Sequence, residues 1–167
     1  MQQQPLAYFI SFRCYGTWLR GDERGWCPRR GDAPASTYAE GAAGLREHDR
    51  ALLKHAPVRL SAEARAVVDA ALVDLCVDRG WELYEHAVNE EHVHAMLNAE
   101  DPPERVLVAM KAWATRRLRE AGISPDGARV WSAHGSTEYL WTELSVERVR
   151  RYIARQRPEA RQSTGVA

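Results

Sequence analysis

The stretch WELYEHAVNEEHVHAMLNA, residues 81–99, contains two short runs of apolar, aromatic and β-branched residues. The polar tripeptide Asn89-Glu90-Glu91 separates them and is typical of a tight turn. We therefore expect a β-hairpin with strands over 81–88 and 92–99. Because side chains alternate between the two faces of a strand, His92 and His94 should point to the same face.

Amphipathic helices are expected on both sides of this hairpin. The segment 61–80 begins at Ser61, a favourable N-cap residue, and ends at Gly80. The segment 102–122 begins with two prolines and carries an apolar stripe along one side. A further short helix is expected on the surface within residues 38–55, after an exposed irregular loop.

Strands are expected before and after this central unit. Residues 6–18 are rich in aromatic and β-branched residues and predict a central strand. Residues 128–142 predict a strand, a turn at Gly135 and another strand. Residues 145–156 predict a final helix that begins near Ser145.

The order β, α, β-hairpin, α, β, α predicts an α+β fold of the ferredoxin-like split βαβ type, with an antiparallel sheet. An additional C-terminal helix would carry Tyr152. We expect one domain over residues 1–157 and a disordered, arginine-containing tail over 158–167.

Acidic and basic side chains balance over the 167 residues, with 23 Lys+Arg and 23 Asp+Glu. The neutral net charge argues mildly against nucleic-acid binding, but basic residues are concentrated in 111–119 and 148–161. The cysteines Cys14, Cys27 and Cys76 form no CxxC motif, so we expect reduced thiols. We find no signal peptide and no stretch of membrane-spanning length, and expect a soluble intracellular chain.

Four side chains are candidates for chemistry. His92 and His94 offer two imidazoles from one strand face, but a catalytic metal usually has three protein ligands. Tyr152 and Gln156 lie four residues apart and hence on one helical face. The Gln156 carbonyl oxygen suits Mg²⁺ or Mn²⁺, and the Tyr152 phenol can act as a nucleophile. Polar residues on a half-exposed sheet and an ordinary amphipathic helix explain the same pattern without chemistry.

Several segments together resemble the single-tyrosine HUH transposases, most closely the REP-associated tyrosine transposases. The likeness covers most of residues 6–157 and is weakest over 30–60. His92-Val93-His94 matches the His-hydrophobe-His motif of that family. The segments that carry the resemblance are FISFRCYGTWLRGDERG (9–25), EEHVHAML (90–97), MKAWATRRLREAG (110–122), WSAHGSTEYLW (131–141) and RRYIARQ (150–156).

The resemblance implies a metal-dependent enzyme that nicks single-stranded DNA and transfers the cut strand. His92, His94 and Gln156 would bind Mg²⁺ or Mn²⁺. Tyr152 would attack the scissile phosphodiester, forming a 5′-phosphotyrosine and leaving a free 3′-OH. The implied partners are single-stranded or hairpin DNA and a second copy of the chain in a homodimer, with no membrane. Such an enzyme would work in the bacterial cytoplasm, at the nucleoid when bound to DNA.

Basic side chains on the last two helices would then form a track for phosphates. They are Lys111, Arg116, Arg117, Arg119, Arg148, Arg151 and Arg155. Trp131, Tyr139 and Trp141 are candidates for base stacking, and we expect at least one of them in the core. Solvated helix faces explain such charge runs equally well.

Two other functions agree with these residues. A domesticated relative would bind a DNA or RNA hairpin without cleaving it and would need only the basic helices. A small metal-dependent hydrolase would use His92 and His94 to activate water and would not need Tyr152. Tyr84 and His86, on the partner strand, are expected on the face of the histidine pair, where His86 is a weaker ligand candidate.

Overall fold

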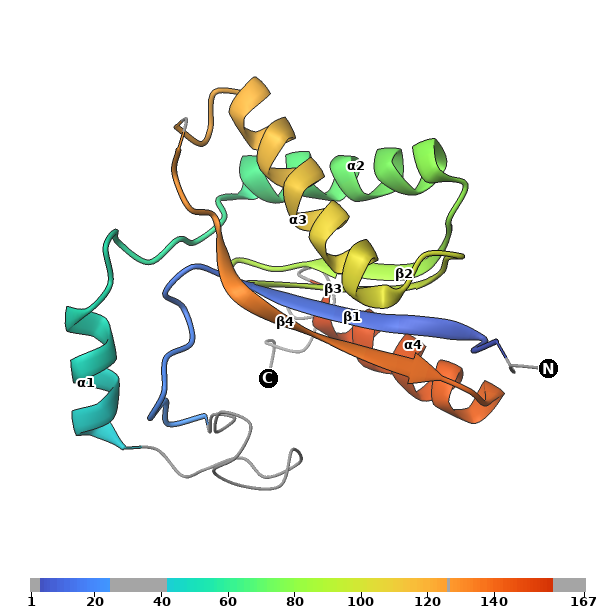
Figure 1. The fold of residues 1–167 in the computed structure, drawn as a ribbon, viewed down its shortest axis with the longest axis horizontal. Helices are drawn as coiled ribbons and strands as arrows, with labels where there is room; N and C mark the ends of the chain where they lie inside the picture. Colours follow the sequence, from blue (N-terminus) through green and yellow to red (C-terminus); the bar gives the residue numbers. More distant parts are fainter. Residues whose placement is uncertain (1–3, 25–41, 126, 158–167) are drawn as a thin grey trace, which may run out of the picture.

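A computed structural model describes residues 4–24, 42–125 and 127–157. The predicted α+β fold with a C-terminal helix is confirmed (Figure 1). Cys27, positions 25–36 of the predicted loop and the predicted tail over 158–167 lie outside the described residues. In chain order the elements are β1 (Ala7–Cys14), α1 (Ala43–Ala51), α2 (Ala62–Arg79), β2 (Glu82–Val88), β3 (His92–Asn98), α3 (Pro103–Glu120), β4 (Trp131–Leu140) and α4 (Glu143–Gln156).

The four strands form one sheet in the order β2-β3-β1-β4, with every neighbouring pair antiparallel. β1 therefore lies inside the sheet, as its aromatic and β-branched composition predicts. The predicted hairpin is the β2–β3 pair, in which Val88 lies opposite Val93. This strand order is that of the ferredoxin-like split βαβ plan.

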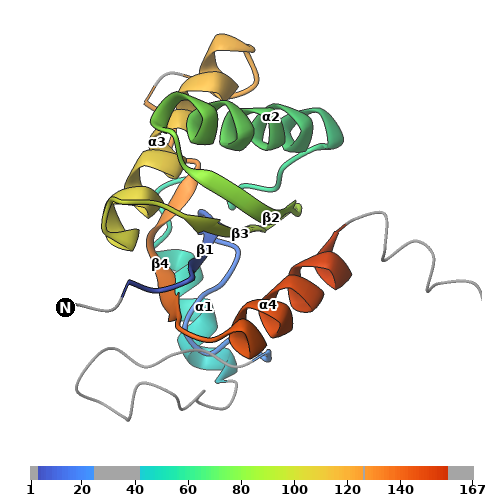
Figure 2. The same ribbon diagram turned by 90° about the vertical axis from the view of Figure 1, so that its right-hand side faces the viewer.

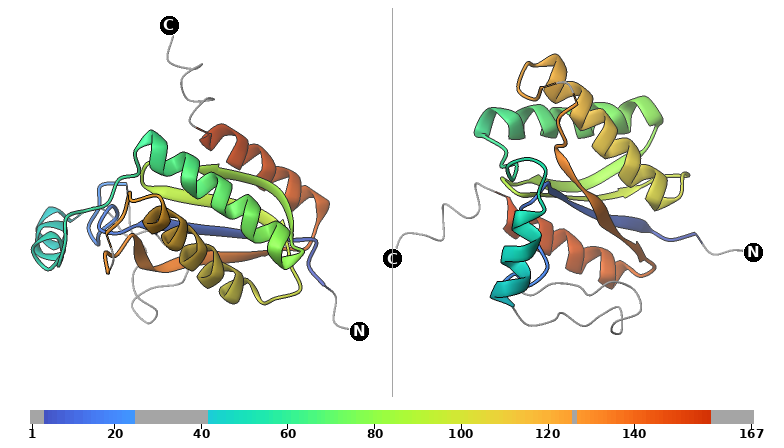
Figure 3. Two further views of the ribbon diagram at one scale, coloured as in Figure 1. Left: turned by 90° about the horizontal axis from the view of Figure 1, so that it is seen from above. Right: turned by 60° about the vertical axis from the view of Figure 1, so that its left-hand side comes forward.

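The sheet lies between two layers of helices (Figures 2 and 3). Helices α2 and α3 cover one face, and α4 covers the other. Residues of β1 alternate accordingly: Ile10 and Phe12 pack in the larger core under α2 and α3, whereas Ala7 and Phe9 pack under α4. In β1 the odd-numbered side chains therefore face α4, and the even-numbered ones face α2 and α3.

Local sequence signals set the limits of α2 correctly. The Ser61 side chain accepts a hydrogen bond of 3.1 Å from the backbone N–H of Ala64, which satisfies one of the unpaired donors at the helix start. Gly80 ends the helix with φ of 66°, a left-handed conformation that favours glycine. Between them, Cys76 is a free thiol buried in the core, as is Cys14 on β1.

The predicted turn at Gly135 is wrong. β4 runs as one strand from Trp131 to Leu140, and Gly135 pairs with Phe12 in its middle. A Cβ at Gly135 would lie 2.7 Å from the backbone oxygen of Ser11 and 3.0 Å from the Leu107 side chain of α3. The glycine therefore permits a close approach of strand and helix, which a sequence reading does not distinguish from a turn.

Candidate functional site

His92 and His94 share the sheet face that α4 covers, as the strand alternation predicts. Met96, two residues further along β3, packs in the small core under α4. The two imidazole ring centroids are 4.7 Å apart. His94 is buried, with 6% of its surface exposed, and His92 is half-buried. His94 is therefore shielded from solvent, whereas part of His92 can be reached from it.

Polar neighbours hold both rings. Ser11 Oγ, on β1, lies 2.6 Å from His94 Nδ1, and Asn89 Nδ2 lies 3.2 Å from His92 Nε2. Sequence reasoning missed Ser11 and Asn89 as site residues. Ser11 is the residue of β1 directly opposite His94. It could be found as a site residue only from the pairing of β1 with β3, which the sequence does not give.

Helix α4 begins at Glu143, two residues before its predicted start. Thr142 is the N-cap residue, and its side-chain oxygen accepts a hydrogen bond of 3.2 Å from the Ser145 backbone N–H. The Ser145 side chain in turn bonds the Thr142 backbone, completing a capping box. Ser145 is thus the third residue of the helix and not its cap.

Packing of α4 on the sheet sets the position of Tyr152. Val149 and Ile153 are buried in the small core, and Tyr152 lies at its edge with 45% of its surface exposed. Its ring meets the rings of Phe9 and His94 edge-on, at centroid distances of 6.0 and 5.3 Å. The Tyr152 hydroxyl lies 3.5 Å from His94 Nε2. The structure therefore joins the predicted nucleophile to the predicted histidine pair within one chain.

Gln156 lies one helical turn beyond Tyr152 on α4 and is half-buried. Two imidazoles and this amide are donors of the kind that a divalent cation accepts. Over the described ranges no three His, Cys, Asp or Glu side chains gather in a way that could hold a metal ion. The predicted donor set of two nitrogens from β3 and an amide oxygen from α4 stays a prediction.

The expected facing of His86 is wrong, because β2 contains a β-bulge. The register shifts between Leu83, opposite Leu97, and Glu85, opposite Met96. One extra residue in a strand reverses the facing of everything after it. His86 therefore points to the α2 side, where its Nε2 lies 2.8 Å from Asp69 Oδ1, and it cannot join the histidine pair.

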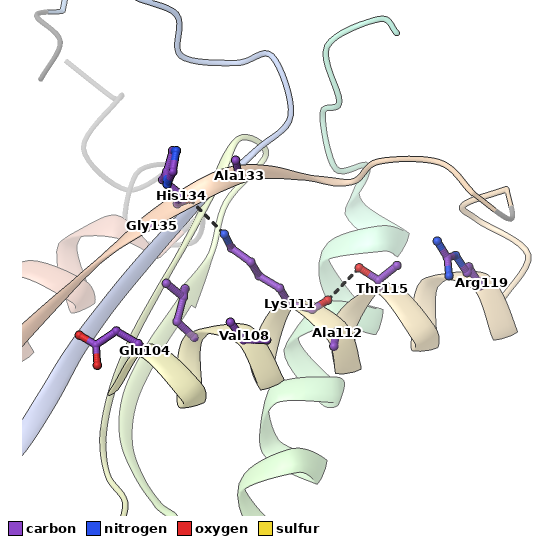
Figure 4. A pocket seen from close by; sticks show the side chains of 10 residues that line it. Glu104, Val108, Lys111, Ala112, Thr115, Arg119, Ala133, His134 and Gly135 are labelled. Carbon is purple, nitrogen blue, oxygen red and sulfur yellow. Dashed lines mark hydrogen bonds between the residues drawn. The ribbon is translucent and has the colours of Figure 1, made fainter. Parts of the chain in front are cut away.

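The predicted basic residues do not form one track, because α3 and α4 lie on opposite faces of the sheet. On α3, Lys111 is half-buried beside a groove of about 590 Å³ that it lines together with Arg119. Its ammonium group donates to the backbone oxygen of His134 on β4 at 3.0 Å (Figure 4). It also donates to the backbone oxygen of Ser132 at 3.0 Å. Burial, with the nearby charge of Arg129, lowers the pKa of Lys111.

Most of the other predicted basic residues have acidic partners. Arg117 pairs with Asp74 of α2 at 3.1 Å, and Arg116 pairs with Glu120 at 3.6 Å. On α4, Arg148 pairs with Glu138 at 2.9 Å, and Arg151 pairs with Glu147 at 3.1 Å. All of these pairs are at least partly exposed, so phosphates can compete for the arginines.

The three aromatic candidates for base stacking differ in burial. Trp131 belongs to the core, and its indole N–H lies 3.0 Å from the Thr115 hydroxyl. Tyr139 and Trp141 are 43% and 48% exposed and stack on each other with centroids 5.8 Å apart. The expectation of at least one core residue among the three is confirmed.

One cation beside the histidine pair was missed by sequence reasoning. Arg13 on β1 lies directly opposite His92, two residues beyond Ser11, and so points to the same face. The Arg13 guanidinium carbon lies 3.4 Å from the centroid of Trp18, and that of Arg24 lies 4.4 Å from the same ring. These contacts fix a positive group next to the site.

Solved structures with the same fold include two transposases. One is a REP-associated tyrosine transposase bound to a REP hairpin, 11% identical with a TM-score of 0.52, and the match covers 89% of this chain. This chain spans 64% of the length of that protein. Another is a Deinococcus radiodurans protein assigned as a transposase, 16% identical with a TM-score of 0.51 over 92% of each chain. No family model and no curated protein matches the sequence. The expected resemblance to tyrosine transposases is confirmed at the level of the fold.

Proposed function

We propose that this chain nicks single-stranded DNA and transfers the cut strand through a 5′-phosphotyrosine on Tyr152. The observation that carries the proposal is the distance of 3.5 Å between the Tyr152 hydroxyl and His94 Nε2. The exposure of Tyr152 supports it, because a nucleophile that attacks a polymer must be reached from solvent. The fold shared with a REP-associated tyrosine transposase supports the reaction class by analogy.

In the proposed step the Tyr152 oxygen forms a bond to the scissile phosphorus while the bond from phosphorus to the 3′ oxygen breaks. The phenol loses a proton and the departing 3′ oxygen gains one. Because Ser11 occupies Nδ1, Nε2 is the nitrogen of His94 that faces the Tyr152 oxygen here and that would hold the metal ion when one is bound. In strand transfer a 3′-OH attacks the phosphotyrosine, and the Tyr152 oxygen leaves. The phosphodiester is conserved, so no external energy source is needed.

His92, His94 and Gln156 are the residues that we propose to hold Mg²⁺ or Mn²⁺. Their fit rests on the two neighbouring imidazoles of β3 and on the position of Gln156 one turn beyond the nucleophile. When bound, the ion would withdraw charge from the phosphate oxygens in the transition state. The protein contributes the fixed positions of the two histidines, through Ser11 and Asn89.

Single-stranded or hairpin DNA is the substrate that we propose, since the REP-associated relative was solved with a REP hairpin. Arg13, beside His92, is the group best placed to meet a phosphate next to the cut. Exposed arginines of α4 share the helix of Tyr152 and would meet the strand nearby; these are Arg148, Arg151 and Arg155. The basic residues of α3 would contact DNA on the far face of the sheet; these are Lys111, Arg116, Arg117 and Arg119.

A homodimer and a bacterial cytoplasmic location stay predictions. Among the residues that the structure describes, no helix is long and apolar enough to cross a membrane. We propose that Tyr152 and His94 of the same chain act together, since their contact is made within one chain.

The test is an incubation of the full chain with 5′- and 3′-end-labelled hairpin DNAs and Mn²⁺, followed by a denaturing protein gel. We expect the 3′-end label to stay on the wild-type protein, to require the metal and to disappear in Tyr152→Phe, whereas the 5′-end label leaves with the fragment that ends in the free 3′-OH. Tyr139→Phe is a matched control, because Tyr139 is similarly exposed but lies on the other face of the sheet. It should form as much adduct as the wild type.

Two results would replace the proposal. DNA binding without adduct across a varied hairpin pool would favour the binding module, which needs only the basic helices. Cleavage that persists in Tyr152→Phe would mean that water attacks, as in a metal-dependent hydrolase.

A further inference from the structure

Arg157, the residue that follows α4, links the end of this helix to β2. The Arg157 guanidinium pairs with the carboxylate of Glu85, and its Nε donates to the backbone oxygen of His86 at 3.4 Å. The Glu85 side chain is only 16% exposed. A carboxylate that is largely removed from water is costly unless a cation and hydrogen bonds compensate it, so this contact matters more than an exposed ion pair.

The β-bulge in β2 is what brings Glu85 to this contact. In a regular strand Tyr84 would lie opposite Met96, and Glu85 would point to the α2 side. The bulge instead places Glu85 opposite Met96, on the face that α4 covers. Bulges are common next to functional sites, where they redirect a side chain. Here the redirected side chain meets the residue that follows Gln156.

Three contacts together hold α4 along its length. The capping box of Thr142 and Ser145 fixes its start, and Val149 and Ile153 fix its middle. Arg157 fixes its end, five residues after Tyr152. The last turn of a helix frays most readily because its carbonyl groups lack partners within the helix. Without Arg157, the turn that carries Tyr152 and Gln156 would be held on the sheet by the buried Ile153 and by the ring contacts of Tyr152.

We propose that Glu85 and Arg157 are positioning residues that keep the last turn of α4 on β2 and thereby keep Tyr152 against His94. The effect of this contact on catalysis rests on the function proposed above. Its effect on the position of α4 does not depend on that function. A displacement of the nucleophile by about 1 Å costs on the order of 100-fold in rate, which sets the scale of the expected effect.

The variants are Glu85→Gln, which removes the charge at nearly constant volume, Arg157→Gln, which removes the charge and shortens the side chain, and Arg157→Lys, which keeps the charge but loses the forked geometry. Arg157 is about half exposed, so its replacement leaves both cores intact. Arg150→Gln is the matched control, because Arg150 pairs with Glu147 inside α4 and does not reach the sheet through that pair.

Two readouts are independent of activity. The first is the nuclear Overhauser contact between the Tyr152 and His94 rings, whose centroids lie 5.3 Å apart. The second is amide hydrogen exchange over 152–157, with α2 as the internal reference. We expect the ring contact to weaken at least about twofold and exchange to accelerate about tenfold in both glutamine variants. The effect should be smaller in Arg157→Lys and absent in Arg150→Gln.

The third readout is the rate of adduct formation at saturating DNA and Mn²⁺. We expect a loss of about 10-fold or more in the glutamine variants with DNA affinity within about twofold of the wild type. Unchanged ring contact and exchange in Arg157→Gln would overturn the proposal, as would a weakened contact with an unchanged adduct rate. If the wild type forms no adduct with any hairpin, the proposed function fails, and the first two readouts alone decide whether Glu85 and Arg157 hold the helix.

Discussion

Ser11 and His94 face each other across the β1–β3 pair, with Ser11 Oγ 2.6 Å from His94 Nδ1. This contact occupies one ring nitrogen and directs the other towards Tyr152. Groups that orient a functional histidine typically contribute about 10- to 100-fold to metal affinity or activity. We predict that Ser11→Ala lowers the rate of adduct formation, or raises the Mn²⁺ concentration needed for it, by about that factor. A metal titration of adduct formation on the denaturing gel measures both.

The control for Ser11 is Ser136, the residue opposite it on β4, which is exposed. Ser136→Ala should change neither the rate nor the metal requirement by more than about twofold, because it removes a hydroxyl that is already solvated. Equal losses in the two variants would mean that Ser11 has no particular role in orienting His94.

The contact between Tyr152 and His94 is made inside one chain, which predicts that catalysis does not need residues from a partner. A mixture of Tyr152→Phe and His94→Ala should therefore form no adduct, even after the chains are unfolded and refolded together to exchange subunits. If tyrosine from one chain served the histidines of another, such mixed dimers would contain an intact site and would recover up to about a quarter to a half of the wild-type activity. The adduct assay on the refolded mixture separates the two results.

Gly135 is predicted to be indispensable for the packing of β4 against α3. In Gly135→Ala the new methyl group would meet the Ser11 backbone oxygen at 2.7 Å and Leu107 at 3.0 Å. Backbone cannot give way as a flexible side chain does, so we expect a loss of about 1–3 kcal/mol in the free energy of unfolding, measured by urea denaturation. Gly44→Ala on α1 is the control, since its Cβ would meet no atom within 4 Å. It should leave the free energy of unfolding unchanged or raise it slightly.

Features with local causes could be predicted from the sequence. The limits of α2 follow from Ser61 and Gly80, which act on their own backbone. The shared facing of His92 and His94 follows from strand alternation, and Tyr152 approaches them because the final helix packs on that face. Element order alone was enough to predict the sheet plan.

Features with nonlocal causes could not be predicted. Gly135 was misread because its neighbour Leu107 lies 28 positions earlier in the chain and approaches only in the folded state. The β-bulge in β2 reverses the faces to which Glu85 and His86 point, and the composition of the strand does not indicate it. The basic residues of α3 and α4 were expected to lie together, and only the sheet topology shows that a whole layer separates them. Ser11 and Arg13 became site residues only through their pairing with β3.

Arg13 is predicted to bind a phosphate close to the cut, because it lies beside His92 on the same face. Arg13→Gln should weaken hairpin binding about 5- to 10-fold and reduce the slope of log Kd against log salt by close to one, as expected for one lost phosphate contact. Arg79→Gln is the control, since Arg79 ends α2 on the other side of the sheet. Fluorescence anisotropy with labelled hairpin over a series of salt concentrations measures both quantities. An unchanged salt slope in Arg13→Gln would remove Arg13 from the interface.

Asp22 makes the loop after β1 sensitive to acid. Its carboxylate is buried and accepts two hydrogen bonds of 2.8 Å, from Nε and Nη2 of Arg24. These hydrogen bonds from the Arg24 side chain lower the pKa of Asp22 to about 2, although burial opposes the shift. A carboxyl group whose pKa is lower in the folded state than the usual ~3.9 stabilises the fold above that pH and loses its contribution as the pH falls towards 2.

We predict that Asp22→Asn lowers the free energy of unfolding by about 2 kcal/mol at pH 7, and that the difference from the wild type shrinks progressively between about pH 4 and pH 2. Urea denaturation at pH 7, 4, 3 and 2 measures this difference. Asp78→Asn is the control, because Asp78 is half exposed and lies 3.6 Å from Arg79 in a surface pair, which is worth less than about 1 kcal/mol at any of these pH values. A difference between Asp22→Asn and the wild type that stays constant down to pH 2 would show that the asparagine disturbs packing and that the charge of Asp22 contributes little.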